Sequence, residues 1–171
     1  IETPAAERFE AAGVGVEVIS DAQPPWLAVA GWESVESADG GLERSTVEAV
    51  GRLARTGEEH RMLWVVASAP AETETEASDW MENLEAIDRA LGEFDRCVGA
   101  AIDGLEQAGL SGEALLVVTG GRGAWLGDRG FEDPARAALH EERLRTPLLL
   151  RGPGIEPAQR RLELVQVIDL L

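Results

Sequence analysis

Apolar residues along the chain form several short runs of the kind that β-strands bury. Val14–Ser20 alternates apolar and polar positions and is rich in β-branched residues, which predicts a strand. Arg61–Ala69 is almost continuously apolar, as is typical of a central strand buried on both faces. We expect a short strand at Trp26–Trp32 and further buried strands at Ala114–Val118 and Thr146–Ile155, the last ended by a Gly-Pro-Gly turn.

A different spacing, with apolar residues three and four positions apart, predicts one long helix with a single apolar stripe. The stripe consists of Trp80, Leu84, Ile87, Leu91, Phe94, Val98, Ile102 and Leu105. Asp79 with Glu82 fits a capping pair at its start, and Gly109 fits its end. Three glycines inside the stripe would let the helix pack closely against a sheet: Gly92, Gly99 and Gly104. Glu43–Arg55 has the spacing of a second helix.

The order strand, long helix, strand predicts a right-handed parallel crossover. We therefore expect one α/β domain over residues 1–171, with a mainly parallel sheet flanked by helices. The last residues, from Gln159, fit a strand followed by the start of a helix. Functional loops of parallel sheets lie at the carboxyl ends of strands, where the glycine-rich segment Val117–Gly130 is placed.

Charge narrows the possible partners. The formal net charge is -17, the pI is about 4.4, and every basic side chain apart from the two histidines is an arginine. Such a chain repels phosphate backbones and anionic membrane surfaces, so we expect neither nucleic acid nor membrane as a partner. The single cysteine, Cys97, excludes an internal disulfide, and its place on the apolar side of the long helix predicts a buried, inert thiol.

The sequence contains no complete catalytic motif that we can identify. Val117–Gly130 lacks the spacing and the Lys-Ser/Thr of a P-loop, so a plain tight connection is the simpler interpretation. His60 and His140 are far apart, and no His, Cys and Asp cluster has metal-ligand spacing. Arginines crowd the last third of the chain: Arg122, Arg129, Arg136, Arg143, Arg145 and Arg151. They could hold a sulfate, phosphate or carboxylate, or they could pair with the abundant acidic residues nearby.

Three stretches together resemble the sulfatases of the alkaline phosphatase superfamily. They are FDRCVGAAIDGLEQAGLSGEALLVVTGGRGAWLGDRG, ALHEERLRTPLLLRGPGI and LVQVIDLL, which fall within residues 94–171. Earlier in the chain, RMLWVVASAP at residues 61–70 is similar to a family strand that ends in Ala-Pro, and residues 1–58 are unassigned. The resemblance implies an alkaline-phosphatase-like fold and the C-terminal part of a catalytic domain, so we expect a piece of a longer polypeptide.

The differences from the family fall on the positions that the family uses for metal. The resemblance places Gly121 and Arg122 where family members have a metal-binding Asp and a metal-binding His or Asn. Ala124 stands at a family glutamate and Arg129 at a later histidine. A hard divalent cation needs oxygen ligands, which these side chains do not offer. We therefore interpret Gly121 and Arg122 as degenerate metal-ligand positions.

The anion-contacting positions are changed more conservatively. Arg136 stands where active members have the lysine that contacts the sulfate group, and His140 stands at the family tyrosine. The Arg122 guanidinium could replace the lost cation charge and hold an anion. Candidate anion-binding residues are therefore Arg122, Arg129, Arg136 and His140.

The sequence thus favours a non-catalytic, sulfatase-like domain with a structural, interaction or binding role and no catalytic residue of its own. It contains no C/S-x-P-x-R segment, the site of the formylglycine nucleophile in active sulfatases. Two alternatives stay open: a sulfatase or related phosphoesterase whose remaining site lies outside this chain, and a sulfate- or anion-binding module. We expect no cofactor, with a divalent metal such as calcium only in the enzyme alternative. The partner would be a protein or a sulfated or anionic ligand, of unknown identity, and the oligomeric state is open. The compartment is also open. We expect a cytoplasmic protein from the absence of an export signal in this sequence, and an exported one if a longer parent carries such a signal.

Overall fold

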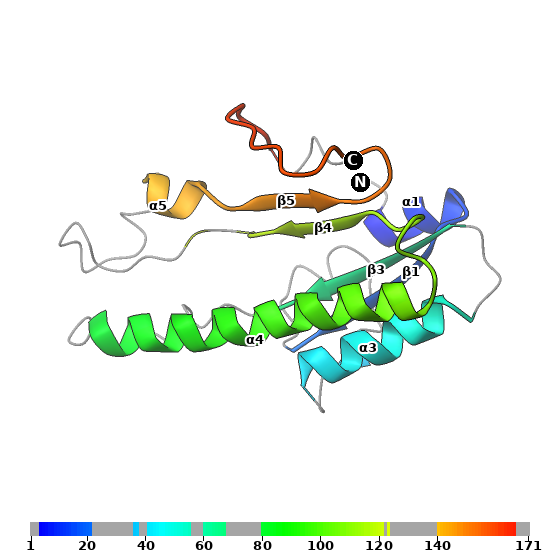
Figure 1. Ribbon diagram of the computed structural model, residues 1–171, viewed down its shortest axis with the longest axis horizontal. Coiled ribbons are helices and arrows are strands. Elements are labelled where there is room, and N and C mark those ends of the chain that lie inside the picture. The colour runs from blue at the N-terminus through cyan, green and yellow to red at the C-terminus, as the bar shows by residue number, and fades with distance from the viewer. Residues whose placement is uncertain are drawn as a thin grey trace.

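The described part of the chain contains a small parallel sheet. The computed structural model describes residues 4–21, 36–37, 41–55, 60–67, 80–121, 123 and 140–166. Strand β1 (Gly15–Ser20) lies between β2 (Glu36–Ser37) and β3 (Arg61–Val66), and both neighbours run parallel to it (Figure 1). Gly15 lies opposite Arg61 and Ser20 opposite Val66, so β1 and β3 end at the same edge. This arrangement confirms the expected α/β class with a parallel sheet.

Two helices and β1 form the core. Helix α3 (Leu42–Leu53) packs on β1 and on the long helix α4 (Trp80–Gln107), and Figure 1 shows α3 alongside the C-terminal half of α4. The short helix α1 (Ala5–Ala11) precedes β1 and contacts it. The buried apolar side chains come from these elements: Val18, Ile19, Ala49, Val50, Cys97 and Ala101. Ile19 is fully buried, so β1 is the centre of this core.

Helix α4 follows its apolar stripe closely and ends as predicted. Gly109 adopts a φ of 72°, and the amide of Leu110 donates to the carbonyl oxygen of Leu105 at 2.8 Å. A residue with positive φ after the last turn is the usual way to satisfy terminal carbonyls, and glycine does this without strain.

The glycines of α4 were expected to let the helix pack closely against a sheet, and this prediction was wrong about the neighbouring element. A Cβ on Gly104 would lie 3.1 Å from the Cγ1 atom of Val50 on α3, so Gly104 permits close packing of two helices rather than of a helix on a sheet. Gly99 has nothing within 4 Å of that position, and Gly92 has only the end of the Arg96 side chain. Only Gly104 of these three therefore has a packing role.

A second, separate sheet contains β4 (Leu116–Thr119) and β5 (Leu148–Arg151), which pair antiparallel. This corrects the expected parallel crossover from residues 61–69 to residues 114–118, because β4 does not pair with β3. It also corrects the expected burial, since Leu115 and Leu149 are each 59% exposed. An apolar run specifies a strand but carries no information about which strand lies beside it. Within the described sheet, β3 is an edge strand and not the central strand that its composition predicts.

The remaining described segment is mostly irregular. The four-residue helix α5 (Glu141–Leu144) precedes β5, and Gly154 with a φ of 75° forms part of the predicted turn after it. Residues 152–166 contain no strand or helix, so the strand expected after Gln159 is not found up to Gln166. The predictions for Trp26–Trp32, for Asp79 and for residues 167–171 lie outside the described residues. None of the described helices is long and apolar enough to cross a membrane.

Candidate functional site

The loop that follows β4 begins in a fixed geometry. The amide of Gly120 donates to the carbonyl oxygen of Pro147 at 3.3 Å, which continues the β4–β5 ladder by one residue. A Cβ on Gly120 would lie 3.1 Å from the Cβ atom of Thr146, so a larger residue would press on the start of β5. The fold therefore holds the first residue of this loop and leaves little room for a larger side chain there.

Gly121, the next residue, has no such constraint. It is exposed, a Cβ built on it would meet nothing within 4 Å, and its φ lies outside the left-handed region that favours glycine. Gly152, directly after β5, has no room for a side chain, because its Cβ would lie 2.8 Å from the carbonyl oxygen of Ala114. Local geometry thus accounts for Gly152 and Gly120 but does not require a glycine at position 121.

The predicted anion-binding residues are only partly placed by the structure. His140 is half-buried and is the N-cap residue of α5, where its carbonyl oxygen accepts a hydrogen bond from the amide of Leu144 at 3.2 Å. Arg122, Arg129 and Arg136 lie outside the described residues. The structure therefore gives a position for His140 and for the degenerate metal position Gly121, and does not test whether the four candidates converge.

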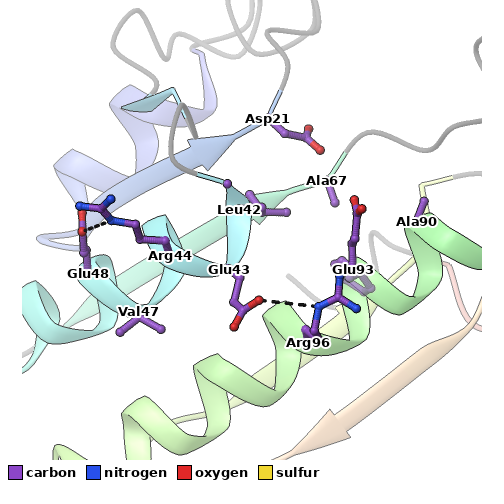
Figure 2. A pocket seen from close by; sticks show the side chains of 12 residues that line it. Asp21, Leu42, Glu43, Arg44, Val47, Glu48, Ala67, Ala90, Glu93 and Arg96 are labelled. Atoms are coloured by element: carbon purple, nitrogen blue, oxygen red, sulfur yellow. Dashed lines mark hydrogen bonds and ion pairs between the residues drawn. The ribbon is translucent and has the colours of Figure 1, made fainter.

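A second candidate site lies at the edge of the parallel sheet where β1 and β3 end. It is a hollow of about 700 Å³ that the sequence analysis did not predict (Figure 2). Asp21 and Ala67 enter it from the ends of the two strands, and Leu42 enters from the start of α3. From α4, Ala90, Glu93, Phe94 and Arg96 complete the wall. One sequence signal for it existed, since Asp21 directly follows a predicted strand at the edge where α/β sheets bind ligands.

The arginines of this hollow are paired with carboxylates. Arg96 Nε lies 3.8 Å from Glu43 Oε2, and Arg44 Nε donates to Glu48 Oε1 at 2.9 Å (Figure 2). Both pairs are exposed, so each contributes little to stability. With Asp21 and Glu93 added, carboxylates outnumber guanidinium groups in the lining, which disfavours an anionic ligand in this hollow.

Cys97 lies in the α3–α4 contact close to this hollow. Its side chain is 3% exposed, and its sulfur lies 3.2 Å from the hydroxyl oxygen of Thr46, which itself donates to the carbonyl oxygen of Leu42 at 2.8 Å. Burial raises the pKa of the Cys97 thiol, and the carboxylates of Glu43 and Asp21 add to this rise against the opposing effect of Thr46. A thiol kept neutral and out of solvent is a poor nucleophile, in agreement with the predicted inert cysteine.

The described residues contain no group of three or more His, Cys, Asp or Glu side chains that could hold a metal ion.

Comparison with known proteins gives the family. The sulfatase family model matches residues 53–171, which is more than half of the chain, and so the protein belongs to the sulfatase family. The match starts at Leu53 and includes β3 as well as the segments whose motifs resemble the family. No curated protein matches the chain.

Among solved structures, the chain is similar to that of Ps i-CgsB in complex with k-i-k-neocarrahexaose, with 18% sequence identity and a TM-score of 0.47. The match covers 71% of this chain and 29% of that chain, so the chain spans less than a third of that protein's length.

Proposed function

We propose that this chain is a non-catalytic member of the sulfatase family whose metal site is lost and whose role is binding or structure. The observation that carries the proposal is Gly121. It stands at a position where family members have a metal-binding aspartate, yet it is exposed and has room for a side chain. Since no backbone constraint requires a glycine there, the absence of a carboxylate is a chemical change and not an adjustment to packing.

The neighbouring residues support the same conclusion. Arg122 brings a positive charge to the next ligand position. Ala124 stands in place of a family glutamate, and Arg129 stands in place of a family histidine. Calcium and magnesium bind to oxygen ligands, and each lost carboxylate removes both a ligand and a compensating negative charge. The sequence also puts the positive charge of Arg122 directly after position 121, and such a charge disfavours a divalent cation.

Metal binding tests this proposal. Calorimetric titration of calcium or magnesium into the purified chain, with metal analysis of the protein before titration, should give no saturable heat and no stoichiometric metal. Protein treated with a chelator and untreated protein should unfold at the same temperature. Stoichiometric calcium together with turnover of an aryl sulfate would instead support the alternative of a hydrolase whose remaining site lies elsewhere.

The anion-binding alternative has one specific argument: Arg122 directly follows an exposed residue at the end of a strand, where a guanidinium group could replace the cation charge. Inorganic sulfate should then bind to the chain with a measurable heat that Arg122→Ala abolishes. Arg44→Ala, which removes an exposed arginine of α3, is the matched control and should leave the heat unchanged. Equal heats for wild type and Arg122→Ala would contradict this alternative.

A further inference from the structure

We draw no further inference here: the strongest candidate, the hollow at the carboxyl ends of β1 and β3, is lined by exposed carboxylates and paired arginines, and nothing in the described part of the chain points to a ligand for them.

Discussion

The two sheets of this molecule are built from similar apolar strands but reach different degrees of burial. In the β2–β1–β3 sheet, the helices α3 and α4 complete a core in which Ile19 has no exposed surface. In the β4–β5 sheet, the equally apolar Leu149 remains 59% exposed. Strand composition alone therefore does not establish a core, because burial requires a second layer. The difference separates a region with a closed apolar core from a region whose apolar side chains stay exposed.

The largest expected effect is the loss of Ile19. Ile19→Ala removes apolar contacts at the centre of the core and should lower the free energy of unfolding by about 2–5 kcal/mol. Leu149→Ala, in the exposed sheet, should change it by less than about 0.5 kcal/mol. Urea denaturation of the two variants measures both values. Equal losses would show that the two sheets do not differ in burial.

A smaller effect should follow from Gly152→Ala. Its Cβ would lie 2.8 Å from the carbonyl oxygen of Ala114 and 2.9 Å from the Cα atom of Leu115, so the backbone next to β4 must shift. We expect a loss of about 1–3 kcal/mol, the usual range for overpacking. Hydrogen exchange should locate the loss in β4 and β5 and not in β1. Gly112→Ala, where a Cβ meets nothing within 4 Å, is a control that should leave the exchange of β4 and β5 unchanged.

Alkaline pH should weaken the first region through Cys97. Because the pKa of the folded thiol is raised, the folded state favours the neutral form. This contribution to stability is fully present below the unfolded pKa and is lost as pH rises through the folded pKa. The sequence has no lysine and no tyrosine, so Cys97 is the side chain expected to ionise in the alkaline range below the pKa of arginine. The free energy of unfolding should fall over this range in the wild type and stay level in Cys97→Ala. Parallel pH profiles for the two proteins would contradict this assignment.

The smallest effect should come from Gly121→Asp. The position is exposed and has space for a side chain, so the variant should keep its free energy of unfolding within about 0.5 kcal/mol of the wild type. Gly120→Asp, one residue earlier, should be clearly less stable because its Cβ would lie 3.1 Å from Thr146. Thermal unfolding of the pair compares them directly. A Gly121→Asp variant as unstable as Gly120→Asp would show that position 121 needs a glycine.

The sequence predicted elements better than it predicted their neighbours. The apolar stripe located α4, and Gly109 located its end, because both depend on residues close together in the chain. Val14–Ser20 likewise predicted β1 almost to the residue. The partner of β4, the helix that packs on Gly104 and the hollow beside Asp21 depend on contacts between distant segments, and no local pattern encodes those.

The candidate site was predictable only through the family. Nothing in the composition of Val117–Gly130 shows that Gly121 stands at a metal position, and that meaning came from the similar order of motifs in sulfatases. The structure added a separate fact, that Gly121 has room for a side chain where Gly120 does not. The match to the sulfatase family over residues 53–171 confirms the resemblance, while the loss of the metal site stays a prediction.

Hydrolysis of an aryl sulfate by the purified chain, measured with and without added calcium, tests the proposed loss of catalysis most directly. The account predicts that the rate of product release equals that of buffer alone under both conditions, with no difference between wild type and Gly121→Asp. Calcium-dependent turnover by the wild-type chain would contradict it.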